Sequence, residues 1–301
     1  MNILVTGGSG MLGGYLLPIL KNEGNVLTTL QRRDADIICD LTKEIPNFGE
    51  KIFDVIIHAA GSHDEADALE LNLEGTRRLL EALEAIPPRE FVYVASWEVY
   101  SPDSGEGVKE DHQLWAATKV GQSKARAEEI VRNWCADHNV LLTIVRPARM
   151  FGKGVKGEMR TLFNDVVNSR YIHIRGNDAK LSLVCASDVA EAIEKLHSIG
   201  GTFNISDGKD TKWIELAEAM SSNSGAMKRQ TFLPKKWADV AWKFASWIPA
   251  VKASLSPEIL SRRSKTLTLS SEALEMAFPD WSPYPTIDVI SRVNKDYPYL
   301  D

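Results

Sequence analysis

The stretch TGGSGMLGGY, which runs from Thr6 to Tyr15, follows a short apolar start of the chain, Met1 to Val5. That start is rich in β-branched and Leu residues and is too short for a helix, so it predicts a strand. Three glycines then recur at three-residue steps and open a helical leucine pattern. In a dinucleotide site, one such glycine permits a tight turn, one lets backbone amides approach the pyrophosphate, and one lets the helix pack close to the strand. The residues predicted to line this site are Gly7, Gly10, Met11, Leu12 and Gly13.

Composition narrows the classes to which the chain can belong. With 301 residues, 44% of them hydrophobic, it can bury a substantial core as one large or two modest domains. A net charge of −6 gives no basic footprint for nucleic acid, and no apolar run is long enough for stable membrane insertion. The first strand begins at residue 2, which leaves no room for a signal peptide. Cys39, Cys135 and Cys185 match neither a zinc spacing nor a disulfide framework, so we expect reduced thiols, no metal and a cytoplasmic location.

Strand-like and helix-like segments alternate through the first half of the chain. The strand-like runs lack in/out alternation of apolar residues, which is typical of a sheet covered on both faces. This order predicts an α/β fold with a doubly wound parallel sheet. Pro18 is expected to bend the first helix. The predicted strands are 2–6, 26–30, 36–39, 53–58, 91–95, 141–145, 171–174 and 202–205, and the predicted helices include 69–85 and 118–137.

The pattern loosens after Pro147, where short strands alternate with helices and loops. We therefore predict a dinucleotide-binding domain at 1–150 and a smaller, partly discontinuous substrate domain at 151–301. Residues of about 181–206 are expected to return to the first domain. The substrate domain should lie over the carboxyl ends of the strands, where sheets of this class bind ligands.

Further short motifs follow the glycine-rich turn along the chain. In their sequence and order, the chain resembles the extended short-chain dehydrogenase/reductases of the NAD-dependent epimerase/dehydratase family over nearly its whole length. The resemblance implies a Rossmann fold and a nicotinamide cofactor. The motifs that carry it are TGGSGMLG (6–13), DL (40–41), HAAG (58–61), NLEGTRRLLEA (72–82), FVYVASWEVY (91–100), GQSKARAE (121–128), RP (146–147) and SDVA (187–190).

The resemblance also implies cofactor contacts beyond the glycine-rich turn. Asp40 and Leu41 occupy a position that contacts adenine, although Asp40 has a second interpretation as the cap of its own turn through Thr42. The remaining cofactor residues belong to the turn after the fourth strand, to the active-site lysine and to a later proline. They are Ala59, Ala60, Gly61, Lys124 and Pro147.

The end of the second strand indicates which nicotinamide cofactor is bound. An acidic residue there would hydrogen-bond the ribose and repel a 2′-phosphate. This chain has Gln31, Arg32 and Arg33 instead, and a guanidinium pairs well with phosphate. The pattern favours NADP over NAD. The alternative is a solvated arginine pair in a surface loop that Asp34 neutralises.

The catalytic residues of the family are matched in part. There a Tyr protonates the substrate oxygen, a Lys four residues later lowers the pKa of that Tyr and holds the ribose, and a Ser hydrogen-bonds the substrate. The matching positions hold Ser96, Lys124 and Val120, so the Tyr is missing. A shifted alignment on Trp115 and Lys119 has the same spacing but spoils the neighbouring matches, and indole is a poor proton donor. Loss of a positioned acid typically costs about 10²- to 10⁴-fold in rate. The sequence therefore supports dinucleotide binding but does not establish whether the chain catalyses hydride transfer.

Glu98 lies two residues after the Ser position, where some sugar dehydratases of the family have a catalytic Glu. It is a candidate acid or base near the nicotinamide. The alternative is an ordinary side chain at a strand end, which Trp97 favours because it departs from the dehydratase pattern. His112, Tyr100 and Lys119 are further candidate donors, each with an ordinary surface or wall role as the alternative.

The substrate region departs from the family pattern as well. Members that act on sugar nucleotides usually have an Arg a few residues before the Asp188 landmark, and here that position holds Leu181. Arg175 and Lys180 remain candidates for a phosphate. In the stretch 233–253, helical spacing relates Trp237, Ala241, Phe244 and Ala245, with two further tryptophans to the sides. This pattern suits core packing of a lid helix, a wall for an apolar substrate, or a membrane-surface helix.

Two functions fit these patterns. The first is an NAD(P)-binding enzyme that resembles the NAD-dependent epimerases and dehydratases and acts on a nucleotide sugar, or another small carbonyl or hydroxyl substrate, with a non-standard acid or base. The alternative is a non-redox NADP-binding sensor, assembly factor or other protein that has lost dehydrogenase activity. The apolar stripe of 118–137, with Ile130 and Trp134, predicts a homodimer through this helix, although the same stripe can pack on the sheet.

Overall fold

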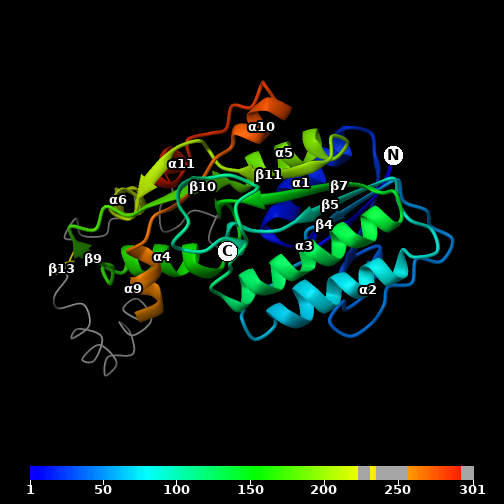
Figure 1. Ribbon diagram of the computed structural model, residues 1–301, viewed down its shortest axis with the longest axis horizontal. Helices are drawn as coiled ribbons and strands as arrows, with labels where there is room; N and C mark the ends of the chain where they lie inside the picture. Colours follow the sequence, from blue (N-terminus) through cyan, green and yellow to red (C-terminus); the bar gives the residue numbers. More distant parts are fainter. Residues whose placement is uncertain (223–230, 235–256, 293–301) are drawn as a thin grey trace.

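The computed structural model describes residues 1–222, 231–234 and 257–292, and its largest element is a parallel sheet (Figure 1). The strands of this sheet are β1 (Asn2–Thr6), β2 (Val26–Gln31), β3 (Ile37–Ile38), β4 (Val55–His58), β5 (Glu90–Val94), β7 (Leu141–Pro147) and β11 (Gly201–Ile205). They lie in the order β11-β7-β5-β4-β1-β2-β3, and every neighbouring pair is parallel. The first strand of the chain therefore lies inside the sheet, between β4 and β2.

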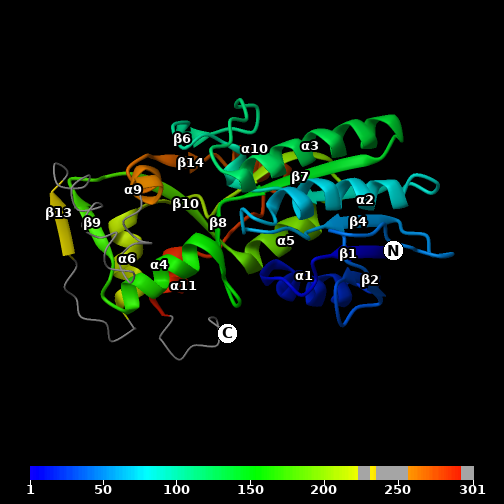
Figure 2. The same ribbon diagram turned by 90° about the horizontal axis from the view of Figure 1, so that it is seen from below.

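Helices cover both faces of this sheet (Figure 2). One face packs against α1 (Met11–Asn22) and α5 (Ala186–Leu196), and the other packs against the π-helical turn η1 (Leu69–Glu74), α2 (Gly75–Ala82) and α3 (Lys119–Asp137). Successive residues of a strand point to opposite faces, so Ile3 and Val5 lie in one core and Leu4 in the other. Both sets are fully buried, which explains why the strands read as continuous apolar runs.

A second group of elements packs beside the carboxyl ends of these strands (Figures 1 and 2). A smaller sheet has the order β12-β10-β14-β6, with β8 paired to β10, and β9 pairs with β13 apart from it. Its strands are β6 (Gly105–Val108), β8 (Arg149–Phe151), β10 (Lys180–Cys185), β12 (Asp210–Lys212) and β14 (Leu267–Leu269), and the separate pair is β9 (Ile172–Arg175) and β13 (Thr231–Pro234). The helices of this group are α4 (Gly157–Val167), α6 (Trp213–Ser222), α9 (Pro257–Arg263) and α11 (Thr286–Ser291). Helix α10 (Glu272–Ala277) packs instead against β11 of the main sheet.

The predicted fold class is confirmed, and the differences concern boundaries. The strand predicted at 36–39 is only Ile37–Ile38, and the predicted 91–95 is Glu90–Val94. The helix predicted over 69–85 is confirmed from Leu69 to Ala82, but its first six residues form a π-helical turn and α2 begins only at Gly75. Asn72 lies in that turn and hydrogen-bonds the hydroxyl of Ser123, 51 residues away, a contact that helical periodicity does not record. Pro18 lies inside α1 as expected.

The smaller sheet draws strands from distant parts of the chain. β6 comes from the first half and was not predicted, since its sequence, GEGV, has almost no apolar residue. β10 belongs to the smaller sheet, whereas β11 joins the main one. The division into domains at residue 150 stays a prediction.

Two features of the sequence bear on membranes. No helix in the described part of the chain has the length and apolar character needed to cross one. Most of the predicted tryptophan-rich helix at 233–253 lies outside the described residues, and its first two residues end β13.

Candidate functional site

The glycine-rich turn joins β1 to α1 by close backbone contacts. Gly7 has φ +76°, a left-handed conformation, and a Cβ there would lie 2.6 Å from the amide nitrogen of Ala60. A Cβ at Gly13 would overlap the backbone of Gly8. The turn closes with a hydrogen bond from the amide of Gly10 to the carbonyl of Gly7, 2.9 Å long.

No side chain caps the amino terminus of α1, so the amides of its first turn face open space beside the turn. Backbone amides and the positive end of the helix dipole together favour an anion there. The residues thus fit a dinucleotide pyrophosphate. We call the space beside the glycine-rich turn and the amino terminus of α1 the cradle, because each glycine stands where a side chain would fill this space or block the helix.

The loop after β4 is tied to the centre of the molecule by buried hydrogen bonds. His58 accepts or donates at both ring nitrogens, to the hydroxyls of Thr6 at 2.6 Å and Thr76 at 2.9 Å. Burial lowers the pKa of His58 to about 3, so its ring is neutral and serves as a structural link. Asn72 continues the link by donating to the hydroxyl of Ser123 on α3 at 3.0 Å. Helix α3 is therefore positioned against the cofactor turn from within the core.

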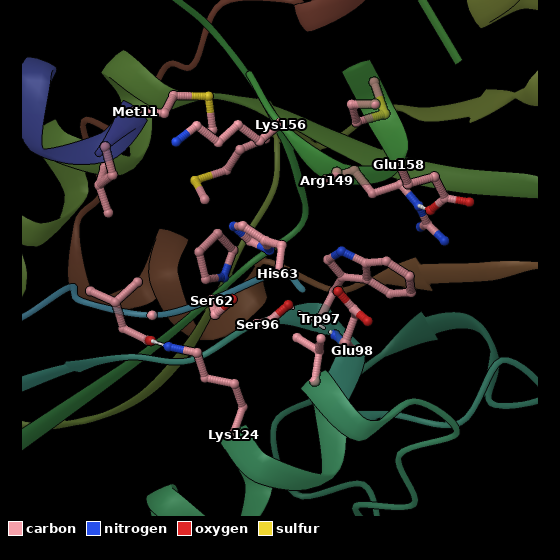
Figure 3. A pocket seen from close by; sticks show the side chains of 18 of the residues that line it. Met11, Ser62, His63, Ser96, Trp97, Glu98, Lys124, Arg149, Lys156 and Glu158 are labelled. Carbon is pink, nitrogen blue, oxygen red and sulfur yellow. Dashed lines mark hydrogen bonds and ion pairs between the residues drawn. The ribbon is translucent and has the colours of Figure 1, made fainter. Parts of the chain in front are cut away.

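A cavity of about 370 Å³ begins at the glycine-rich turn and extends to the second group of elements (Figure 3). It brings together Gly7, Gly10, Met11, Leu12, Ala59, Gly61, Ser96, Glu98, Val120, Lys124 and Pro147, all of them predicted site residues. They come from five separate stretches of the chain, and the parallel sheet is what aligns the ends of those stretches.

Lys124 lies at the bottom of the cavity on α3 and is buried. Its ammonium donates to the carbonyl of Val94 at 2.8 Å and lies 5.2 Å from the ring centroid of Tyr93. Burial lowers the pKa of Lys124 to about 8, although the charges of Glu128 and Glu98 raise it. The side chain is thus held in one place by the strand that precedes the Ser96 turn.

The turn that carries Ser96 and Glu98 is η2 (Trp97–Val99), a short 3₁₀ helix after β5. The hydroxyl of Ser96 accepts the amide of Glu98 at 3.2 Å. The hydroxyl of Thr118 donates to Glu98 Oε2 at 2.8 Å and also accepts the amide of Gly121 at 2.9 Å, which caps α3. A Cβ at Gly121 would overlap the carbonyl of Glu98, so this glycine lets the helix touch the turn.

Glu98 is largely enclosed by this arrangement. Burial raises the pKa of its carboxyl above the usual value, although the hydrogen bond from Thr118 lowers it. Glu98 Oε1 makes no hydrogen bond to any described residue, and the side chain lines the cavity. A carboxyl with a raised pKa keeps its proton to a higher pH than an ordinary one, and its Oε1, which has no partner among the described residues, is the oxygen that can present that proton.

Val120 lies one turn before Lys124 on α3 and also lines the cavity. Its side chain is 4% exposed and offers neither a donor nor an acceptor. The other candidate donors lie elsewhere. Tyr100 is buried in a network in which it donates to Asn204 at 2.8 Å and accepts from Arg146 at 2.7 Å. His112 and Lys119 are exposed, and neither lines the cavity.

A second cavity, of about 830 Å³, continues from the first beyond Gly61 and Lys156, which line both. Arg32 and Asp40, two of the residues predicted to contact the adenosine part of the cofactor, line this second cavity. The Asp40 carboxylate accepts both the amide and the hydroxyl of Thr42, at 3.1 and 2.7 Å, so the turn-capping interpretation holds for this side chain.

The remaining predicted cofactor residues do not line either cavity. Arg33 is exposed, and Leu41 is buried against α2 and the sheet. Gly13 and Ala60 act through the backbone contacts of the turn described above. No ion pair in the described part of the chain joins Asp34 to Arg32 or Arg33, so the arginines are not neutralised in that way.

The far wall of the cavity consists of residues that sequence reasoning missed. Arg149 lies against the ring of Trp97, with its guanidinium carbon 3.6 Å from the ring centroid, and donates to Glu158 at 3.4 Å. Arg262 lies 4.0 Å from the same carboxylate. Nothing in the local sequence pattern indicates that these residues line a cavity, although Arg149 comes only two residues after the RP motif. His63 and Lys156 line both cavities, and Figure 3 shows them in the first.

The structure also gives the surroundings of the residues predicted to bind a phosphate and to form a dimer. Lys180 pairs with Glu106 at 3.2 Å, and neither Lys180 nor Arg175 lines a cavity described above. Ile130 and Trp134 pack against the core of their own chain, where the Trp134 indole donates to Glu84. The homodimer therefore stays a prediction, and the stripe that suggested it is already covered on the inner side. No cluster of metal-ligating side chains occurs within residues 1–222, 231–234 and 257–292.

Comparisons with known proteins agree with this geometry. The NAD dependent epimerase/dehydratase family matches residues 3–206. The chain is 27% identical to the UDP-glucose 4-epimerase of Bacillus subtilis over 301 aligned residues, which cover 81% of this chain and 88% of that protein.

Two solved structures share the fold. RMD from Pseudomonas aeruginosa complexed with NADPH has a TM-score of 0.72 at 21% identity and covers 99% of this chain and 97% of its own. MoeE5 in complex with UDP-glucuronic acid and NAD has a TM-score of 0.74 at 17% identity, with 97% of each chain covered. At these identities the likeness concerns the fold alone.

Proposed function

The chain belongs to the NAD-dependent epimerase/dehydratase family, and we propose that it is an enzyme acting on a nucleotide sugar, or another small hydroxyl or carbonyl substrate, with Glu98 as its acid/base residue. The observation that carries the proposal is the meeting of Glu98, Ser96 and Lys124 in the cavity that starts at the glycine-rich turn. Val120 stands where the family has its Tyr, and Glu98 takes over the proton transfer. Arg32 at the adenosine end makes NADP the preferred cofactor.

The cofactor and the chain have separate tasks in this proposal. A nicotinamide cofactor held by its pyrophosphate at the glycine-rich turn would supply hydride uptake and return at a carbon of the substrate. The residues of the chain move a proton at the neighbouring oxygen and fix the position of that oxygen. Glu98 Oε1 gives a proton to a substrate carbonyl oxygen or takes one from a hydroxyl, while Thr118 holds Oε2.

Ser96 and Lys124 assist this proton transfer from two sides. The Ser96 hydroxyl accepts the Glu98 amide, so its own proton is available to the substrate oxygen. The Lys124 ammonium contributes positive charge below that position and favours the ionised form of Glu98 after the proton has left.

A sugar-nucleotide substrate is supported by one relative, the Bacillus subtilis UDP-glucose 4-epimerase. A sugar bound to a diphosphate is supported by this relative and by an Escherichia coli epimerase that acts on a diphospho-undecaprenol sugar. The alternative, a binding protein without redox activity, is not favoured, because the cavity keeps an enclosed acid beside the cradle.

Removal of the acid tests the proposal. Glu98→Gln keeps the size of the side chain and the bond to Thr118, but cannot carry the proton. With a panel of UDP- and dTDP-sugars, and product detection by mass spectrometry, we expect kcat to fall about 10²- to 10⁴-fold. Glu81→Gln, on the exposed side of α2, is the matched control and should keep full activity.

Val120→Tyr sharpens the same test. A phenol one turn before Lys124 should restore part of the activity lost in Glu98→Gln, because it supplies a second donor above the lysine. Full activity of Glu98→Gln would refute the role of Glu98. Absence of turnover in every variant, despite tight NADPH binding, would favour the binding-protein alternative.

A further inference from the structure

Arg149 is held in an unusual setting at the far wall of the cavity. It begins β8, and only 6% of the residue is exposed. Trp97 covers one face of its guanidinium at 3.6 Å. The ring of Trp213 lies 5.2 Å away on another side (Figure 3 shows Arg149 beside Trp97 and Glu158). Stacking and burial together fix the plane of the guanidinium.

Most hydrogen-bond donors of the Arg149 guanidinium have no partner among the described residues. Nε donates to Glu158 Oε2 at 3.4 Å, and neither terminal nitrogen makes a hydrogen bond to a described residue. Burial of a guanidinium with unused donors is costly unless a ligand accepts them. Burial indeed lowers the pKa of Arg149, although Glu158 raises it. The residue lines the cavity, so a ligand there can reach it.

The surrounding charge also favours a negative ligand. Glu158 is shared by two arginines, at 3.4 Å from Arg149 and 4.0 Å from Arg262. Two guanidinium groups beside one carboxylate leave an excess of one positive charge while the nearby Glu98 carboxyl, whose charge also acts on both arginines, is protonated. Glu158 Oε1 is buried and has no hydrogen-bond partner among the described residues, so it can accept a hydroxyl next to the bound anion.

We propose that Arg149, oriented by Trp97 and Glu158, is the receptor for an oxyanion of the substrate and binds it through its two terminal nitrogens. The inference rests on the proposed function, since it concerns the substrate of the same cavity. Arg175 and Lys180, the cations that the sequence suggested for this task, lie away from the cavity. The oxyanion belongs either to a phosphate of a nucleotide or to the carboxylate of a sugar acid, and both accept a bidentate guanidinium.

Three probes separate the two sources, namely UDP, UDP-glucose and UDP-glucuronic acid, titrated calorimetrically into the full chain saturated with NADPH. Arg149→Gln keeps a planar donor but removes the charge, and Arg149→Lys keeps the charge but removes the fork. If the anion is a phosphate, both variants should weaken binding of all three probes by about 10- to 100-fold. If it is a carboxylate, only UDP-glucuronic acid should lose affinity.

Arg175→Gln, which removes an exposed cation outside the cavity, is the control and should leave all three affinities unchanged. The melting temperature and the NADPH affinity of each variant show that the fold and the cradle are intact. Unchanged affinities in correctly folded Arg149→Gln would overturn the proposal, as would failure of the wild type to bind any of the probes. The proposed function fails separately, if Glu98→Gln keeps its turnover.

Discussion

The two ends of the cavity recognise their ligands by different means. At the cradle end, glycines let backbone amides approach an anion, and no charged side chain takes part in the turn itself. At the far wall, the groups that face the cavity include three charged side chains, Arg149, Glu158 and Arg262, held by stacking and ion pairs. The cradle is therefore determined by backbone geometry, and the wall by the packing of distant side chains.

This difference explains how tolerant each end is to change. A backbone cradle cannot rearrange, because an added Cβ meets main-chain atoms that have no other rotamer. A side-chain wall can exchange its residues while the strands stay in place, which is how one fold serves many substrates. We expect substitutions at the cradle to affect the whole protein and those at the wall to affect specificity.

The largest effect is expected at the cradle. Gly13→Ala places a Cβ against the backbone of Gly8, and neither partner can move aside without shifting β1 or α1. We expect the free energy of unfolding to fall by more than about 3 kcal/mol, at the upper end of overpacking effects, together with loss of NADPH binding. Urea unfolding and calorimetry measure the two quantities.

Gly14→Ala is the matched control one residue later. A Cβ there meets nothing within 4 Å, and the residue lies on the exposed side of α1. Alanine in a helix should stabilise the protein by about 0.5–1 kcal/mol relative to glycine. Equal stability of the two alanine variants would contradict the backbone-cradle interpretation.

The next effect concerns Lys124, which lies between the two ends. Its pKa is about 8 in the folded protein and 10.5 ordinarily, so the unfolded chain binds this proton more tightly. Below pH 8 both states are protonated, and the folded state bears the full cost of the buried charge. As the pH rises from 8 to 10.5 the folded state loses its proton first, so stability increases with pH. The gain is on the order of 3 kcal/mol.

The variant Lys124→Met has no ammonium at this position, so its stability lacks the increase with pH that comes from deprotonation of Lys124. The difference in unfolding free energy between the wild type and the variant, measured by urea titration at pH 7.5, 8.5, 9.5 and 10.5, should therefore shift in favour of the wild type as the pH rises. Other groups that titrate in this range are common to both proteins and cancel. A difference that stays constant with pH would show that Lys124 keeps an ordinary pKa.

The contrast between the cradle and the far wall also explains which features could be predicted from the sequence. The cradle and the turn that carries Ser96 and Glu98 are local, with spacing and composition set within about ten residues, so motif and periodicity were sufficient. The wall gathers Trp97, Arg149, Glu158 and Arg262 from four segments, and only the completed fold brings them together. The π-helical turn before α2 and the glycine-rich β6 were missed for the same reason, because long-range contacts override weak local patterns.

The smallest effect is expected at the adenosine end, where the two neighbouring arginines form a natural pair for comparison. Arg32 lines the second cavity and Arg33 does not, although both are exposed and lie in the same loop. If Arg32 pairs with the 2′-phosphate of NADP, Arg32→Ala should weaken NADPH binding about tenfold, as expected for one exposed charge-assisted contact, and leave NADH binding unchanged. Arg33→Ala should leave both affinities unchanged. Calorimetric titration of both cofactors measures this preference, and a wild type that binds NADH as tightly as NADPH would show that Arg32 does not select the cofactor.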